Sequence, residues 1–334
     1  MVRADLRGAA TEAKTMPELG EALSACLQGS VPHDGYVLVG LDPATGTGCL
    51  LTRRDCYSPG ARLRIRIADA GGVGPHRSPG PFGGGSPVEV TGSGFVDERH
   101  SDYLHGLMAA EGFGAEMYLT LAERGVPRGR LFLLRERGRR PFSAQEADVA
   151  NRLAGELAAA VRCFVAGRLL RPGAPAGPHG VVLVGADNRI RAATPAGNQW
   201  LDVLRRETGA RGDDEVCTLV LTVALPARRE PALTRVPTSL GWVTMSAQAI
   251  DGTADVAVTL GPTGGTMLLP ALVGWYRITA REQAVVEQAL LGLPVKQIAR
   301  RLDLSPYTVN DHLRAVYRKT GVTSREELVT ALAS

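Results

Sequence analysis

The chain has 334 residues, more than one ordinary domain holds, and we expect two or three domains. With 44% hydrophobic and 22% charged residues the composition excludes a disordered chain, and 40 Gly and 21 Pro indicate many turns. No apolar run is long enough for a membrane span and the N-terminus lacks a signal-peptide core, which favours a cytoplasmic protein without membrane contact. The net charge is +4, and most of this excess lies after Tyr276, where nine basic residues face six acidic ones.

The first domain is expected over residues 16–168, after a flexible N-terminus at 1–15. Turn residues after Leu41 join two apolar runs into a hairpin, and Ser143 with Glu146 forms a capping box that begins a long helix. The pattern predicts, in order, a helix at Glu18–Leu27, strands at Gly35–Leu41 and Cys49–Thr52, a helix at Ser101–Glu111, strands at Met117–Glu123 and Gly129–Arg135, and the long helix from Ser143.

The strand Gly129–Arg135 is followed by Arg140-Pro141-Phe142-Ser143 and the long helix. This order of elements and this motif resemble a GAF domain. The resemblance implies a pocket for a small-molecule effector, roofed by the segment between the second and third strands. That segment contains the Gly/Pro-rich run Gly71–Gly94, which is too flexible for a stiff wall. A mobile lid and a plain insertion both remain open, with the insertion favoured.

A second domain is expected over residues 179–262, after a Pro/Gly-rich linker at 169–178. An Asp-Asn turn joins two short apolar strands between Gly180 and Arg191, and Thr194 followed by Pro195 begins a helix. Strands are predicted at Val216–Leu225, Gly241–Ile250 and Asp255–Leu260. The segment resembles a short PAS-like domain with no Cys or His at a flavin or haem attachment position. A second linker is expected at 263–275.

Chemical sites are scarce in these two domains. The cysteines form no CxxC or zinc spacing, which favours buried thiols in a reducing cytosol and leaves a redox-sensing thiol as the alternative. No metal site, cofactor or catalytic residue is predicted, because nucleotide-binding, receiver and GxSxG patterns are all missing. The five cysteines are Cys26, Cys49, Cys56, Cys163 and Cys217.

The last segment, residues 276–334, reads as four short helices. Thr279 with Glu282 forms a capping box at the first helix, and Gly292 and Pro294 separate it from the second. Ser305 is the predicted N-cap of the third helix, with Pro306 at its first position. The fourth helix begins at Ser324, capped reciprocally by Glu327. Joints this short predict helices that cross steeply.

The third helix separates apolar from polar side chains. Val309, Leu313 and Val316 recur at helical spacing and predict a core face. The opposite face carries Tyr307, Asn310, Asp311, Arg314 and Arg318. Asn and Arg are the side chains that pair bidentately with adenine and guanine in the major groove. Asp311 accepts from cytosine or pairs with Arg314 three residues on, and both alternatives stay open.

This segment resembles the LuxR-type (GerE-like) helix-turn-helix of bacterial transcription regulators. The resemblance implies base readout by Asn310, Asp311 and Arg314, and phosphate contacts by Lys296, Thr308, Arg318 and Lys319. Val329 and Leu332 of the fourth helix are candidates for a dimer contact, with core packing as the alternative. The matching residues are Thr279, Arg281, Glu282, Gly292, Ile298, Ala299, Leu304, Ser305, Pro306, Thr308, Val309, His312, Leu313, Lys319, Gly321 and Val322.

The sequence thus predicts a multidomain α+β protein: a GAF-like α/β sensor domain, a PAS-like α+β domain and a C-terminal all-α four-helix domain. The expected function is a sequence-specific DNA-binding transcriptional regulator, and not an enzyme, that reads the major groove with the helix Pro306–Lys319. A module of charge +3 neutralises few phosphates, which favours a homodimer on two half-sites. Expected partners are double-stranded DNA, a small-molecule effector and RNA polymerase. The alternative is a ligand-binding sensor that acts mainly through protein partners.

Overall fold

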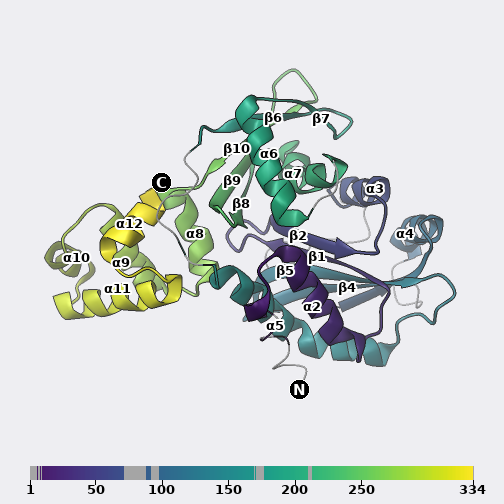
Figure 1. Cartoon of the computed structure of the whole chain (residues 1–334), viewed down its shortest axis with the longest axis horizontal. Helices are drawn as coiled ribbons and strands as arrows, with labels where there is room; N and C mark the ends of the chain where they lie inside the picture. Colours follow the sequence, from purple (N-terminus) through teal and green to yellow (C-terminus); the bar gives the residue numbers. More distant parts are fainter. Residues whose placement is uncertain are drawn as a thin grey trace.

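The computed structural model describes residues 6, 8, 10–70, 88–91, 98–168, 170, 177–209 and 213–333, without the side chains of 98–103, 213–217 and 333. Two five-stranded antiparallel sheets with flanking helices are followed by an all-helical C-terminal domain (Figure 1). This arrangement confirms the predicted mixed fold class. Among the described residues, no helix combines the length and apolar character needed to span a bilayer.

The first sheet has the order β2-β1-β5-β4-β3, and its strand β1 is buried along its whole length. Along β1, Tyr36 and Leu38 join the core beneath α2 and α5, whereas Val37 and Val39 belong to a separate cluster on the other face. Period-two alternation therefore divides one strand between two apolar surroundings. The elements are α2 (Met16–Gln28), β1 (Gly35–Leu41), β2 (Gly48–Arg54), α3 (Pro59–Ala70), β3 (Val88–Thr91), α4 (Glu98–Ala110), β4 (Phe113–Glu123), β5 (Val126–Glu136) and α5 (Ala144–Ala166).

Local signals placed most of these elements correctly. The Ser143–Glu146 capping box is present, with the Glu146 amide donating to Ser143 Oγ over 3.3 Å and Glu146 Oε2 accepting from the Ser143 amide over 2.7 Å. The helix α3 was missed because its Arg-Leu-Arg-Ile-Arg-Ile run alternates like a strand. Packing decides its structure, since Ala61 and Ile65, one helical turn apart, are both buried.

One expectation for this domain needs correction, and another lies mostly outside the described residues. The stretch expected to be a flexible N-terminus contributes Leu6 and Ala10 to the first core, where both are buried. The predicted lid or insertion Gly71–Gly94 lies outside the described residues except for β3. The described part of the roof segment is α3.

The second sheet repeats the strand order of the first, as β7-β6-β10-β9-β8. Thr194 caps α6 by accepting from the Gly197 amide over 3.1 Å, as predicted. The strand β8 was not predicted. The elements are β6 (Gly180–Val184), β7 (Ile190–Ala193), α6 (Pro195–Thr208), α7 (Asp213–Ala227), β8 (Ala232–Thr238), β9 (Gly241–Ala249) and β10 (Val256–Pro262).

The predicted strand Val216–Leu225 is wrong, because this segment lies within the helix α7. Its run of Val, Leu and Thr residues favours a strand by composition. Successive side chains from Leu219 to Leu221, and again Val223 and Ala224, are buried, because α7 contacts β9 of its own sheet and both α3 and β2 of the first domain. A helix that is apolar on all sides lacks the 3.6-residue hydrophobic periodicity by which a helix is predicted from sequence.

The expected linker 263–275 also needs correction, because most of it forms the helix α8 (Gly265–Trp275). Pro270 and Gly274 argued against a helix in the sequence. The helix is nevertheless packed between α5 and α12, with Leu268, Leu272 and Trp275 buried. The segment is therefore a packed helix that connects the second domain to the C-terminal domain (Figure 1).

Polar contacts also join the domains. Asp42, fully buried in the turn after β1, accepts from the Arg235 amide over 3.0 Å and from its guanidinium over 2.8 Å, which ties the first domain to β8. Tyr276 Oη donates to the Arg168 carbonyl over 2.7 Å. The linker expected at 169–178 is described only at Leu170 and from 177 onward. Leu170 donates its amide to the Thr320 carbonyl over 3.1 Å.

The C-terminal domain consists of α9 (Ala280–Leu290), α10 (Val295–Leu302), α11 (Pro306–Thr320) and α12 (Arg325–Ala333). The four predicted helices are therefore present. The reciprocal cap predicted at Ser324 is only half right: Ser324 Oγ accepts from the Glu327 amide over 3.1 Å, but Glu327 Oε2 accepts from Thr323, at both its amide and its hydroxyl.

Candidate nucleic-acid interface

The helix α11 is held in place by its neighbours α9 and α10. Val309 and Leu313 of α11 pack with Val285 of α9 and with Ile298 and Ala299 of α10, all buried in one cluster. These five side chains leave the opposite face of α11 directed away from the protein. The predicted core face of the helix is confirmed.

The joint between α10 and α11 is short and closed by local hydrogen bonds. Asp303 ends α10 in a left-handed conformation, with φ 52°, which Asp tolerates better than most residues. The Leu304 amide donates to the Ala299 carbonyl over 2.9 Å. Ser305 Oγ then accepts from the Thr308 amide over 3.0 Å, which confirms Ser305 as the N-cap. This joint fixes the direction of α11.

The residues predicted to read bases lie together on the free face of α11. Asn310, Arg314 and Arg318 follow at four-residue intervals and all three are exposed, as is Asp311. Arg314 Nη1 lies 3.8 Å from Asp311 Oδ1, with the two side chains 74% and 48% exposed. An exposed pair at this distance contributes at most about 1 kcal/mol, so it leaves both groups available to a ligand.

Tyr307 belongs to the same face and was left out of the predicted base-reading set. Its side chain is 73% exposed, the largest exposure among the large hydrophobic residues described. The sequence signal was present, because Tyr307 precedes Asn310 by three residues and Arg314 by seven. An exposed aromatic ring at the start of α11 can contact a thymine methyl group or a sugar.

The residues predicted to contact phosphates differ in availability. Lys296 and Arg318 are exposed, and Thr308 is half-buried with its hydroxyl 2.8 Å from Ser305 Oγ. Lys319 is engaged inside the domain: Nζ lies 2.6 Å from Glu282 Oε2 and donates to the Arg277 carbonyl over 2.8 Å. Burial opposes ionisation of Glu282, but the hydrogen bonds from Lys319 and the Thr279 amide lower the pKa of its carboxyl.

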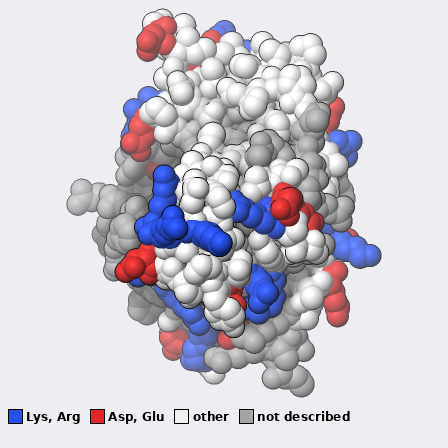
Figure 2. All heavy atoms as spheres, turned by 90° about the vertical axis from the view of Figure 1, so that its left-hand side faces the viewer, with Lys and Arg blue, Asp and Glu red and all other residues white. Residues whose placement is uncertain are grey.

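Basic side chains gather at this end of the molecule. Figure 2 faces the end at which the C-terminal domain lies, and Lys and Arg side chains cluster near its middle with acidic groups mostly around them. Arg300 of α10 is exposed and adds to the charge of Lys296, Arg314 and Arg318. Arg325 is used differently, because it donates to the Ala289 and Leu293 carbonyls at the end of α9.

The two predicted dimer-contact residues are in different surroundings. Leu332 is fully buried in the core that also contains Leu268 and Leu272 of α8. In this arrangement Leu332 fits the core-packing alternative, because α8 covers it. Val329 is half-buried and retains some exposed surface.

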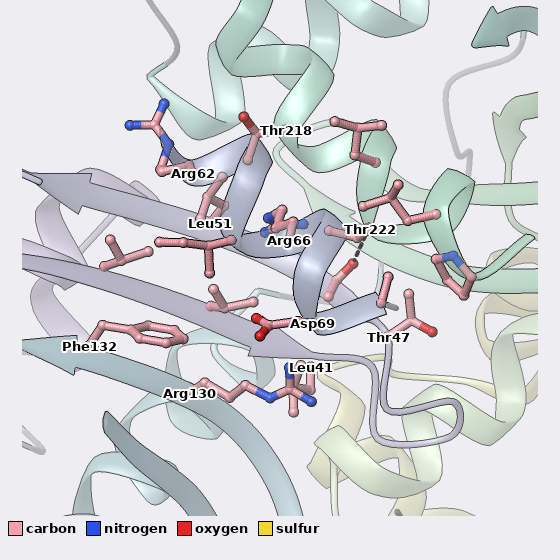
Figure 3. A pocket seen from close by; sticks show the side chains of 18 of the residues that line it. Leu41, Thr47, Leu51, Arg62, Arg66, Asp69, Arg130, Phe132, Thr218 and Thr222 are labelled. Carbon is pink, nitrogen blue, oxygen red and sulfur yellow. Dashed lines mark hydrogen bonds between the residues drawn. The ribbon is translucent and has the colours of Figure 1, made fainter. Parts of the chain in front are cut away.

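A cavity of about 310 Å³ lies away from this surface, between the first sheet, α3 and α7 (Figure 3). Val39, Leu51 and Phe132 of the sheet line it together with Arg66 of α3 and Thr222 of α7. Its volume is at the lower end of the range for small-molecule sites. The described cysteines do not form a chemical centre: Cys49 is buried, which raises the pKa of its thiol, and Cys26, Cys56 and Cys163 are half-buried. Cys217 lies outside the described side chains.

Comparison with known proteins places the C-terminal domain in a family. Residues 277–332 match the family described as "Bacterial regulatory proteins, luxR family". The chain is 47% identical over 60 residues to a Mycobacterium bovis protein named "Putative HTH-type transcriptional regulator", and 44% identical over 62 residues to the "Monoamine regulon transcriptional regulator" of Klebsiella aerogenes. The matches cover 18% and 19% of this chain, and only 7% and 25% of those relatives.

Among solved structures, Escherichia coli SdiA is 12% identical with a TM-score of 0.39, covering 98% of this chain and 94% of that one. A GAF domain from a Coxiella burnetii phosphoenolpyruvate-protein phosphotransferase is 16% identical with a TM-score of 0.31, covering 48% and 90%. The sequence match and the four-helix arrangement agree on the same segment. Residues 277–332 of this chain belong to the luxR family of bacterial regulatory proteins.

Proposed function

We propose that the protein is a cytoplasmic, sequence-specific DNA-binding transcriptional regulator. The observation that carries the proposal is the free face of α11, where Asn310, Arg314 and Tyr307 are exposed while the other face is buried. Amide and guanidinium groups along one exposed helix face match the donors and acceptors of base edges in the major groove. The exposed Lys296 and Arg318 supply charge for the phosphates on either side.

The regulator acts as a dimer on two half-sites in this proposal. The exposed basic charge of one domain is small, and affinity for DNA rises with the number of phosphates neutralised. Two domains joined by protein contacts double that number and set the spacing of the half-sites. Because α8 covers Leu332, the dimer contact forms either elsewhere on the chain or after α12 separates from α8.

Control by the N-terminal domains is supported by contacts at the start of the C-terminal domain. Arg277 pairs with Glu123 of β4, and its carbonyl accepts from Lys319 near the end of α11. A change in the first domain that moves Glu123 therefore reaches α11 through one residue. An effector bound between the domains can change the orientation of the two helix-turn-helix units by favouring one arrangement of these contacts.

The test is selection of bound sequences from a random DNA pool by the purified full-length protein, repeated at two salt concentrations. Enrichment of an inverted repeat, with binding that weakens as salt rises, is the expected result. Unselective or salt-independent binding favours the alternative, a ligand sensor that acts through protein partners. Repeating the selection with residues 276–334 alone distinguishes that alternative from inhibition by the upstream domains.

A further inference from the structure

The cavity between the first two domains has an apolar floor. Val37, Val39 and Leu51 belong to one buried cluster on the face of the first sheet that is opposite α2 and α5, and Phe132 packs against this cluster. Leu221 and Leu225 of α7 add apolar surface from the second domain. The cavity can therefore bury the apolar body of a ligand.

Charged groups at the wall of the cavity are mainly basic. Arg62, Arg66 and Arg130 line it against Asp69 and Glu116. Glu116 is buried and accepts from Tyr57 Oη over 2.7 Å, while Arg62 donates to the Tyr57 carbonyl over 2.5 Å. Glu116 and the Nη1 atom of Arg62 are therefore engaged in structural hydrogen bonds.

Arg66 lies in the cavity, between α3 and α7 (Figure 3). Among the described residues, no group lies close enough to the Arg66 guanidinium to form a hydrogen bond or an ion pair with it. Burial, and then the nearby positive charge of Arg130, lower the pKa of Arg66 to about 10, although Asp69 opposes that shift. A guanidinium held in this way would be stabilised by a negative ligand group, which it can bind through two parallel hydrogen bonds.

The cavity belongs to both domains. Thr222 of α7 lines it and donates from Oγ1 to the Gly48 carbonyl of β2 over 3.0 Å. Thr218, one helical turn earlier, lines the same wall. A ligand in this space contacts the sheet of the first domain and α7 of the second at the same time. Its affinity therefore depends on how the two domains pack together.

From this geometry we propose that the cavity binds a small organic anion with an apolar body, with its carboxylate or phosphate group on Arg66 and its body between the first sheet and α7. The proposal rests on the function proposed above, in which the N-terminal domains receive a signal, and it names the chemical class of that signal. An arginine can bind a carboxylate and a phosphate monoester in the same way, through paired hydrogen bonds. The experiment below distinguishes these two head groups.

The experiment is calorimetric titration of the full-length protein with four probes that share one apolar body: 4-phenylbutyrate, 4-phenylbutyl phosphate, 4-phenylbutyramide and 4-phenylbutylamine. Binding of at least one of the two anions, with the amide and the amine about tenfold weaker or undetectable, is expected. Comparison of the two anions identifies the preferred head group. Equal binding of all four probes, or binding of none, would overturn the proposal.

Two matched pairs of variants locate the site. Arg66→Gln should weaken the anion about tenfold or more, whereas Arg64→Gln, on the exposed side of the same helix, should leave its affinity unchanged. Thr222→Glu should weaken the anion about tenfold relative to Thr222→Gln, because both lose the same hydroxyl but only one adds a repelling charge from α7. Equal affinities within either pair would overturn the corresponding contact.

These titrations contain no DNA, so their outcome is independent of the selection experiment. A protein that binds the anions but no DNA sequence would retain the site and contradict the proposed function. A protein that selects an inverted repeat but binds none of the probes would support the proposed function and contradict the anion site.

Discussion

Arg277, the first residue of the luxR-family domain, forms an ion pair with Glu123, near the end of strand β4 in the N-terminal sheet. Glu123 also accepts from Arg162 over 2.9 Å, and its carboxylate lies 3.9 Å from Arg128 Nε. The Arg128 guanidinium in turn lies 5.6 Å from the centre of the Trp275 ring of α8. One buried carboxylate thus balances three arginines where the first domain and the C-terminal domain meet.

Substitutions of Glu123 and Arg277 in this cluster should lower the stability of the protein by different amounts. Glu123→Gln should lower the free energy of unfolding by about 3 kcal/mol, because it leaves the buried Arg128 without its only nearby carboxylate among the described residues. Burial already lowers the pKa of Arg128 to about 10 despite the opposing charge of Glu123. Arg277→Gln should cost about 1 kcal/mol or less, since its side chain is 42% exposed. Urea unfolding measures both, and equal losses would contradict this account.

Base-reading and phosphate-binding roles predict different consequences for DNA affinity. Arg314→Ala should cost about 1 to 3 kcal/mol at one base pair of the selected sequence and little on unrelated DNA. Lys296→Ala should weaken every sequence alike and lower the salt slope by about one. Fluorescence anisotropy with matched and substituted duplexes measures these effects. A uniform loss on all sequences for Arg314→Ala would remove its base-reading role.

Lys319 should behave as a structural residue as well as a charge. Its bonds to Glu282 and the Arg277 carbonyl join the end of α11 to the start of α9, and its side chain is only 26% exposed. Lys319→Ala should therefore lower the midpoint of thermal unfolding, whereas Lys296→Ala, with an exposed side chain, should not. Scanning calorimetry of the two variants compares them. Unchanged stability of Lys319→Ala would restore a role in DNA binding alone.

The two residues of α12 should also separate. Leu332→Ala should destabilise the protein by about 2 to 5 kcal/mol, because the side chain is fully buried against α8. Val329→Glu places a charge at a half-buried position and should cost less stability. If Val329 lies in the dimer contact, selection with Val329→Glu will lose the spacing preference between half-sites. An unchanged preference would assign Val329 to packing within the domain.

Acid should weaken the first domain through Glu146. Burial raises the pKa of this carboxyl, but hydrogen bonds from Arg135 and Ser143 outweigh it and hold the pKa at about 2. Because the folded pKa lies below the ordinary value of 4.5 for a glutamate, the contribution to stability is complete above about pH 5 and is lost as pH falls towards 2. Unfolding measured between these pH values should show a loss of about 2 kcal/mol that is missing in Glu146→Gln. Equal pH dependence of the two proteins would contradict this assignment.

Features fixed by neighbouring residues could be predicted from the sequence. The capping boxes at Ser143 and Thr279 and the N-cap at Ser305 each lie within four consecutive residues, and all three caps are present. The core face of α11 follows from its spacing alone. These local signals were enough to locate the candidate site and its exposed face.

Features fixed by distant residues could not be predicted. The helix α7 was taken for a strand because both domains bury it, so no polar face interrupts its apolar sequence. The segment expected to be a linker forms the helix α8, although it contains Pro270 and Gly274, and it packs against α5 and α12. The engagement of Lys319 by Glu282 is likewise a contact between helices 37 residues apart in sequence.

The most direct test of DNA reading by α11 is a titration of full-length protein and Arg314→Ala on three duplexes: the enriched inverted repeat, the repeat with one half-site scrambled, and random DNA. Measured by anisotropy at about 50 and about 200 mM salt, the wild-type protein should bind the intact repeat most tightly, lose affinity with either half-site, and weaken as salt rises. Arg314→Ala should lose most of the difference between the repeat and random DNA. Equal affinity of the wild-type protein for all three duplexes would contradict the account.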